Sequence, residues 1–282
     1  MSTFSHPQMM TRLPAVSLTC ILMTLTGCIT PAERYQQAAD GLGLTYTVAL
    51  GQTFDHQVWR NQNRKQSDAT LHVYIEGDGS PWVAGVPSAD PAPRQPVALK
   101  MMAADPTDAV LVGRPCYHRN TARNCSPKQW TSRRYSKATV DSMAHVINAL
   151  RVEGAYRSVV LVGYSGGGVL ATLLARRIDT VDAVVTIGAN LDTTAWTNHH
   201  GYSELTASVN PAELPRQPSR SPEVHYIGRN DSVVPANTRK QYFDRHPDAL
   251  ERIMDDFGHV CCWTERWPEL LDDALRTAAQ NR

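Results

Sequence analysis

A serine, a histidine and an aspartate stand out because together they could carry out nucleophilic catalysis. Ser165 lies in Gly163-Tyr164-Ser165-Gly166-Gly167, which fits the pattern G-x-S-x-G. A serine hydroxyl is a weak nucleophile until a base removes its proton, and histidine does this near neutral pH. His259 is the candidate base. Asp231 would orient the imidazole ring of His259 and stabilise its protonated form.

The residues around Ser165 favour a sharp turn between a strand and a helix. Residues 159–162 form an apolar, β-branched run typical of a strand buried on both faces, and a segment with helical apolar spacing follows the glycines. Any side chain at Gly163 or Gly167 would collide with the neighbouring strand or helix. The same residues would also suit a glycine-rich turn of an ordinary α/β protein, so only the rest of the chain can distinguish the two interpretations.

Strand-like and helix-like segments alternate along the chain, which predicts an α/β fold with a mostly parallel central sheet and helices on both faces. The expected strands cover residues 45–50, 57–60, 71–76, 109–112, 159–162, 183–187, 224–227 and 252–254. The expected helices cover about 96–104, 136–154, the segment after Ser165, 236–245 and 264–279. No linker divides residues 44–282, so we expect one domain with insertions at about 114–135 and 189–221.

Ser165, Asp231 and His259 each follow an expected strand, and ligands in open α/β sheets gather at the carboxyl ends of strands. Their order along the chain, Ser…Asp…His, is that of the α/β hydrolases. The chain resembles the α/β-hydrolase superfamily from about residue 45 to residue 279. The resemblance rests on these three residues, on Gly228-Arg229-Asn230-Asp231-Ser232-Val233-Val234-Pro235 and on Gly258-His259.

The resemblance implies an oxyanion hole made of two backbone N–H groups. One belongs to Gly166, directly after the nucleophile, and the other comes from the loop after the strand at 71–76, where it aligns with Asp78. Many members carry His-Gly-x in that loop, whereas this chain has Glu76-Gly77-Asp78. We expect the two carboxylates to point away from the developing negative charge, or Glu76 to pair with an arginine.

Other residues compete for the same roles. Asp192 follows the preceding strand, a position that some members use for the acid, whereas Asp255 and Asp256 lie too near His259 along the chain. His225 lies within a strand and is expected to be a core histidine with its hydrogen bonds satisfied.

The first insertion contains six cationic and no acidic residues between positions 114 and 134: Arg114, Arg119, Arg123, Lys128, Arg133 and Arg134. They could bind an anionic substrate or an anionic membrane surface, or form a solvated loop whose charge is balanced elsewhere. Trp130, Trp196 and Trp263 could line an acyl pocket or simply pack in the core.

The N-terminus has the pattern of an export signal. One arginine, Arg12, precedes an apolar stretch from Leu13 to Leu25, which is too short to span a bilayer. Leu25-Thr26-Gly27-Cys28 resembles a bacterial lipoprotein signal, which implies a signal peptide at 1–27, a lipidated Cys28 and a membrane-proximal linker at 28–43. The protein is therefore expected in the bacterial cell envelope, on the periplasmic face of a membrane. A plain secretory signal or an uncleaved anchor is the alternative.

Export places the remaining cysteines in an oxidising compartment, where disulfides form. Cys116, Cys125, Cys261 and Cys262 allow three pairings, and the sequence does not choose among them. Adjacent Cys261 and Cys262 lack the spacer of a zinc-ribbon pair, so no metal site is expected.

These features predict a lipid-anchored serine hydrolase that cleaves a carboxylic ester through an acyl-enzyme, with thioester, amide and peptide substrates left open. It would act on a small-molecule or lipid ester and need no cofactor. A net charge of +1 without a basic tail gives no indication of nucleic-acid binding, and the oligomeric state is left open. The alternatives are a non-catalytic envelope lipoprotein that uses the fold for binding, which the Glu76-Gly77-Asp78 loop favours, and an acyltransferase.

Overall fold

The computed structural model describes residues 29–61, 69–118, 124–216 and 221–281, together with residues 1, 3 and 63. The expected signal peptide and Cys28 lie outside the described residues, as do Arg119 and Arg123. Within the described residues, no helix has both the length and the apolar character needed to cross a bilayer.

An eight-stranded sheet forms the centre of the fold. From edge to edge its strands are β1 (Thr45–Leu50), β2 (Asp55–Arg60), β6 (Ala109–Val112), β3 (Thr70–Ile75), β7 (Ser158–Tyr164), β8 (Val181–Ile187), β9 (Glu223–Gly228) and β10 (Leu250–Met254). Strand β2 is antiparallel to both of its neighbours, and every pair from β6 to β10 is parallel. The mostly parallel sheet predicted from the sequence is thus confirmed. A separate hairpin pairs β4 (Trp82–Val83) with β5 (Val86–Pro87).

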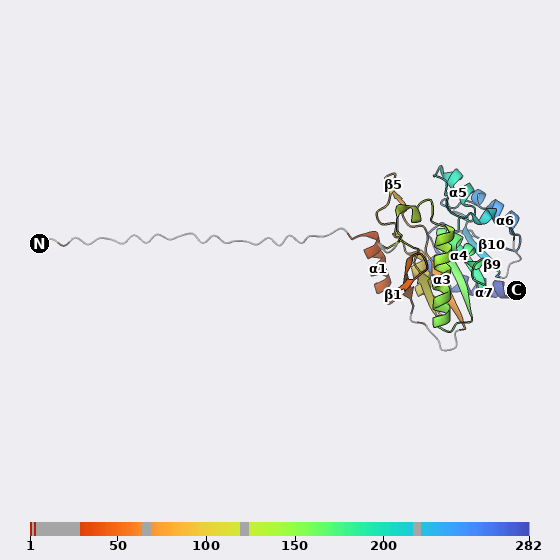
Figure 1. The fold of residues 1–282 in the computed structure, drawn as a ribbon, viewed down its shortest axis with the longest axis horizontal. Coiled ribbons are helices and arrows are strands. Elements are labelled where there is room, and N and C mark those ends of the chain that lie inside the picture. The colour runs from red at the N-terminus through yellow and green to blue at the C-terminus, as the bar shows by residue number, and fades with distance from the viewer. Residues whose placement is uncertain are drawn as a thin grey trace.

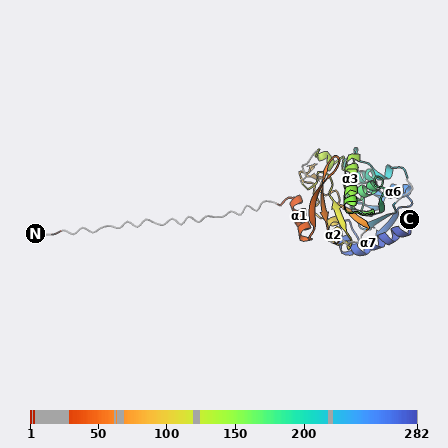
Figure 2. The same ribbon diagram turned by 60° about the horizontal axis from the view of Figure 1, so that its bottom comes forward.

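Helices cover both faces of the sheet (Figures 1 and 2). On one face pack α1 (Pro31–Gly41), α2 (Val97–Ala103) and α7 (Trp263–Gln280). On the other pack α3 (Lys137–Glu153) and α4 (Gly166–Ala175). The central strand β7 shows why its sequence is apolar throughout: Val160 and Val162 face the first layer, while Val159 and Leu161 face the second.

Helix α1 corrects the expectation of a linker at 28–43. Thr30 caps this helix in a capping box with Glu33, and Tyr35 and Ala39 are buried in the core shared with α2 and α7. Residues 31–41 are therefore part of the folded domain, because their apolar side chains supply core contacts that a linker would not make.

The two insertions contain short elements of their own. The first includes the 3₁₀ turn η1 (Pro127–Gln129), and the second includes α5 (Thr193–His200) and η2 (Pro211–Glu213). The helix expected at 236–245 is divided into η3 (Ala236–Thr238) and α6 (Lys240–Arg245).

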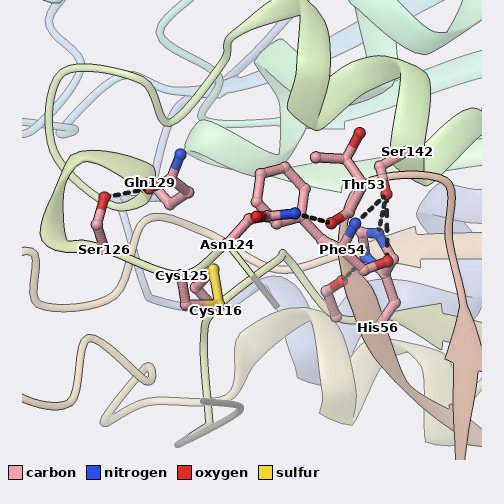
Figure 3. Close-up of a disulfide and its surroundings, with 10 residues drawn as sticks. Thr53, Phe54, His56, Cys116, Asn124, Cys125, Ser126, Gln129 and Ser142 are labelled. Carbon is pink, nitrogen blue, oxygen red and sulfur yellow. Dashed lines mark hydrogen bonds between the residues drawn. A yellow bond between two sulfur atoms is a disulfide. The ribbon is translucent and has the colours of Figure 1, made fainter. Parts of the chain in front are cut away.

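Disulfides join neighbouring cysteines, which is the local pairing among the three that the sequence allows. Cys116 is bonded to Cys125, and Cys261 to Cys262. Around the first bond, Phe54, Tyr117 and Trp130 form a small apolar cluster. Asn124 Nδ2 donates a hydrogen bond of 3.1 Å to the Thr53 carbonyl, which ties the first insertion to the turn between β1 and β2 (Figure 3).

Candidate active site

Ser165 occupies the turn between β7 and α4 in a strained backbone conformation. Its φ angle is 52° and its ψ angle is −124°, a combination that a residue with a Cβ rarely adopts. A Cβ on Gly163 would collide with the backbone of Gly167, and a Cβ on Gly167 would collide with the carbonyl of Ile75. Both glycines are therefore required by the close approach of strand and helix, as the sequence predicted.

The structure brings Ser165, His259 and Asp231 together at the carboxyl end of the sheet. His259 Nε2 lies 3.1 Å from Ser165 Oγ, and His259 Nδ1 lies 2.8 Å from Asp231 Oδ2. These contacts join residues 94 and 28 positions apart in the chain. A serine, a base and a group that orients the base thus lie within hydrogen-bonding distance of one another.

The Asp231 carboxylate is held in one orientation from behind. Its Oδ1 accepts hydrogen bonds of 2.8 Å from the N–H groups of Val233 and Val234, which leaves Oδ2 directed at His259. Burial disfavours the charged carboxylate, but the hydrogen bond and charge of His259, with the two backbone N–H groups, outweigh it and lower the pKa of Asp231. Asp231 is therefore an ionised partner for the imidazole.

Two aromatic residues hold the backbone of His259, a role that the sequence did not indicate. The Tyr164 hydroxyl and Trp263 Nε1 donate hydrogen bonds of 3.1 and 2.9 Å to the His259 carbonyl oxygen. The Tyr164 ring also lies against the imidazole, with 5.2 Å between ring centroids. Trp263 is fully buried, so its place is in the core and not in an acyl pocket.

Two backbone N–H groups beside Ser165 are available to bind an oxyanion. Among the described residues, neither Gly166 N–H nor Asp78 N–H donates a hydrogen bond to the protein. Gly77 N–H, by contrast, donates to Glu76 Oε1 at 3.1 Å. A Cβ on Gly77 would lie 3.3 Å from the Ser165 Cβ, so this loop passes directly over the nucleophile. The geometry therefore favours Asp78 over Gly77 as the second donor.

A cavity of about 1080 Å³ opens over Ser165 and His259. Its lining includes Gly77 and Trp82 from the loop after β3, and Trp196 and Tyr202 from the second insertion. Of the three tryptophans considered from the sequence, only Trp196 lines this cavity, while Trp130 packs beside the Cys116–Cys125 bond.

The model of one protein family, described as serine hydrolase (FSH1), matches residues 117–261. This is slightly more than half of the 282 residues and includes Ser165, Asp231 and His259. The chain belongs to this family of serine hydrolases. It is therefore an enzyme, and the non-catalytic alternative is not supported.

Solved structures similar to this serine hydrolase share its fold at low sequence identity. An esterase from Pyrococcus furiosus has a TM-score of 0.59 at 12% identity, over 85% of this chain and 93% of its own. A bacterial membrane phospholipase A has a TM-score of 0.54 at 15% identity, over 89% and 92%. A lidless serine hydrolase from Xanthomonas campestris has a TM-score of 0.51 at 12% identity, over 84% and 94%. The predicted α/β-hydrolase fold is confirmed. No curated protein matches the sequence significantly.

A charged cluster holds the Asp78 loop of this serine hydrolase. Arg114 Nη1 donates to Asp78 Oδ1, while Arg134 Nη1 and the Tyr135 hydroxyl donate to Asp78 Oδ2 at 2.7 and 2.6 Å. The Tyr117 hydroxyl donates to the Asp78 carbonyl at 3.0 Å. We call Arg114, Arg134, Tyr135 and Tyr117 the Asp78 clamp. Every member comes from the first insertion.

The clamp keeps Asp78 ionised within the protein. Burial would raise the pKa of Asp78, but the charges of Arg114 and Arg134 and the hydrogen bond from Tyr135 hold it well below its usual range. Both arginine side chains are buried. With one carboxylate for two guanidinium groups, the cluster has a net positive charge next to the Asp78 N–H, which favours a negative charge there.

The clamp changes the interpretation of the arginine-rich insertion. Arg114 and Arg134 bind an internal carboxylate, whereas Lys128 and Arg133 are exposed to solvent. The sequence contained a signal for this arrangement: an unusual aspartate in the oxyanion loop, and an insertion rich in arginine without acidic residues of its own. Nothing local in the sequence connected the two.

Among the described residues, Glu76 pairs with no arginine, contrary to one of the two expectations. Its carboxylate accepts hydrogen bonds of 3.3 Å from the N–H groups of Ala98 and Leu99 and one of 3.4 Å from the Tyr35 hydroxyl. It thus caps the N-terminus of α2, where Pro96 supplies no side-chain cap. Burial raises the pKa of Glu76 to about 7, and the hydrogen bonds offset this only in part.

The competing residues have structural partners elsewhere or are exposed to solvent. Asp192 caps α5 through a 3.0 Å hydrogen bond from Ala195 N–H and accepts another from Asn210. Asp255 forms an exposed ion pair with Arg229, and Asp256 is exposed. His225 is buried in β9 beside Thr186 and Glu223, as expected of a core histidine. Within the described ranges, no cluster of three or more His, Cys, Asp or Glu side chains could hold a metal ion.

Proposed function

We propose that this serine hydrolase cleaves a carboxylic ester through a covalent acyl-enzyme, with Ser165, His259 and Asp231 as its catalytic triad. The observation that carries the proposal is the 3.1 Å contact between Ser165 Oγ and His259 Nε2, next to two backbone N–H groups that have no acceptor among the described residues. Esterases with the same fold among the solved structures support an ester as the substrate.

In the first half-reaction, Ser165 Oγ attacks the ester carbonyl carbon while His259 Nε2 takes the hydroxyl proton. Asp231 stabilises the imidazolium that forms. The tetrahedral oxyanion accepts hydrogen bonds from the N–H groups of Gly166 and Asp78, and the net positive charge of the Asp78 clamp adds to this stabilisation. The C–O bond then breaks, and the leaving alkoxide takes the proton from His259.

In the second half-reaction, water attacks the acyl-enzyme. His259 removes a proton from this water, the same two N–H groups bind the second oxyanion, and the acid leaves as Ser165 regains its proton. An acyltransferase would follow the same path with another alcohol or amine in place of water.

The test is labelling with a fluorophosphonate probe, which reacts with activated serines. We expect wild-type protein to be labelled, and Ser165→Ala and His259→Ala to lose labelling while remaining folded. An unlabelled but folded wild-type protein would disprove the proposed triad.

We also propose that the enzyme is exported and attached to a membrane through a lipidated Cys28. The apolar stretch from Leu13 to Leu25 and the run Leu25-Thr26-Gly27-Cys28 support this. Replacing the cysteine, Cys28→Ser, is expected to block lipidation and processing, so the mature membrane-attached form should be lost. Unchanged processing and membrane attachment would rule out lipidation.

A further inference from the structure

The loop between β3 and α2 exposes an apolar hairpin. Its strands β4 and β5 pair Trp82 with Pro87, and a 2.9 Å hydrogen bond from Ser88 N–H to the Pro81 carbonyl closes its base. The relative exposures of Trp82, Val83 and Val86 are 47%, 43% and 60%. Three large apolar side chains on one six-residue hairpin are costly to leave in water, which indicates a surface that covers them.

The hairpin lies at the mouth of the cavity. Trp82 and Gly85 line the cavity, and Asp78 lies in the same loop only four residues before Trp82. Tyr202 and Val233 also line the cavity and are exposed. Any surface that covers the hairpin therefore also lies against the entrance to Ser165.

The same loop contacts the start of the folded chain. Ala32 N–H, in the first turn of α1, donates a hydrogen bond of 2.8 Å to Asp90 Oδ2, and Asp90 lies two residues after the base of the hairpin. In Figure 1, β5 and the start of α1 lie at the same end of the molecule. The site of chain entry and the hairpin are thus parts of one side of the enzyme.

Few residues separate the proposed lipidation site, Cys28, from the first helix of the fold. Only Ile29 and Thr30 separate it from α1, and three Cα–Cα steps span at most about 11 Å. Ile29 is itself an exposed apolar side chain. A lipid attached at Cys28 would therefore hold the membrane surface close to Asp90 and the hairpin.

We propose that the hairpin of residues 82–87 docks into the membrane that holds the Cys28 anchor, so that the cavity opens onto the bilayer and the substrate is a membrane lipid ester. This rests on the proposed ester hydrolase activity and on lipidation of Cys28. The lipid anchor supplies attachment, and the hairpin sets orientation. Tryptophan suits this place because its ring is apolar and its N–H reaches the headgroup layer.

The first test measures the depth of Trp82 directly. The mature lipoprotein is reconstituted into phosphatidylethanolamine–phosphatidylglycerol vesicles with or without brominated acyl chains, which quench nearby tryptophans. The emission of Trp82 is the difference between wild type and Trp82→Phe, since the other five of the six tryptophans are shared. We expect brominated vesicles to quench this difference. A Trp82 emission equal in both kinds of vesicle would overturn the proposal, as would occupation of the hairpin by a second protein copy.

The second test separates docking from chemistry. Val83→Ser combined with Val86→Ser is expected to lower the ratio of vesicle-lipid hydrolysis to short soluble-ester hydrolysis roughly tenfold. The control is Val152→Ser, which changes a valine of 66% exposure in the last turn of α3, where no cavity-lining residue lies. An unchanged ratio in the double variant contradicts docking. Wild-type protein without soluble-ester hydrolysis would instead contradict the proposed ester chemistry.

Discussion

The carboxylate of Asp78 fills the space that a side chain at position 166 would need. A Cβ on Gly166 would collide with Asp78 Oδ1 and with the Tyr135 hydroxyl that binds the same carboxylate. The residue after the nucleophile and the loop opposite it are thus fitted to each other. Because Gly166 and Asp78 would also supply the two oxyanion donors, the clamp and the oxyanion hole form one unit.

The first prediction follows from this contact. Gly166→Ala should displace Asp78 from the clamp, move its N–H, and lower kcat by about 10²-fold, the usual cost of losing one oxyanion donor. Steady-state kinetics on a short soluble ester measures the effect. The control is Gly258→Ala beside His259, where a Cβ would come no closer than 3.7 Å to any residue other than its two chain neighbours. Equal kcat values for the two variants would contradict the fit between Gly166 and Asp78.

The second prediction concerns the arginines. Arg134→Met leaves the Asp78 carboxylate with Arg114 and Tyr135 only, and should lower the free energy of unfolding by about 3 kcal/mol because a buried ion pair loses one partner. It should also lower kcat more than it changes KM, whereas Arg134→Lys should restore part of kcat. The adjacent Arg133→Met is the control, since that side chain is exposed and should change stability by no more than about 0.5 kcal/mol. Similar unfolding midpoints in urea for both methionine variants would refute the clamp.

The third prediction uses the ionisation of Glu76. Its folded-state pKa is raised from about 4.5 to about 7, so its contribution to stability is complete below pH 4.5 and is lost as the pH rises through 7. Glu76→Gln cannot ionise. Relative to this variant, wild type should lose at most about 3 kcal/mol of unfolding free energy between pH 4.5 and 8. Urea unfolding of both proteins across this range tests it, and a constant difference would show that Glu76 does not titrate there.

The fourth prediction distinguishes the two candidate acids. Asp231→Asn should lower kcat by about 10³- to 10⁴-fold, because the amide favours the wrong imidazole tautomer. Asp192→Asn should leave kcat near the wild-type value, since asparagine caps helices about as well as aspartate and keeps the oxygen that accepts from Ala195. A large loss of kcat in the Asp192 variant alone would show that Asp192, and not Asp231, is the acid of the triad.

Local patterns in the sequence were enough to predict the mostly parallel sheet and the places of Ser165, Asp231 and His259. Each of these residues follows its own strand, and parallel strands bring their carboxyl ends to one edge, so the strand pattern alone predicts that the three meet. The strained turn at Ser165 was predictable for a similar reason, because its glycines are adjacent in the chain.

The tertiary structure alone decided how the surrounding loops meet. Asp78 contacts Arg114 and Arg134 across 36 and 56 residues, and Ala32 contacts Asp90 across 58. No periodicity links such positions, because loop paths depend on packing against the finished sheet. For the same reason the linker predicted at 28–43 was wrong, since Tyr35 and Ala39 of α1 are core residues. The strand order thus predicted where the reacting groups lie, whereas the support of the Asp78 loop depends on contacts between residues far apart in the chain.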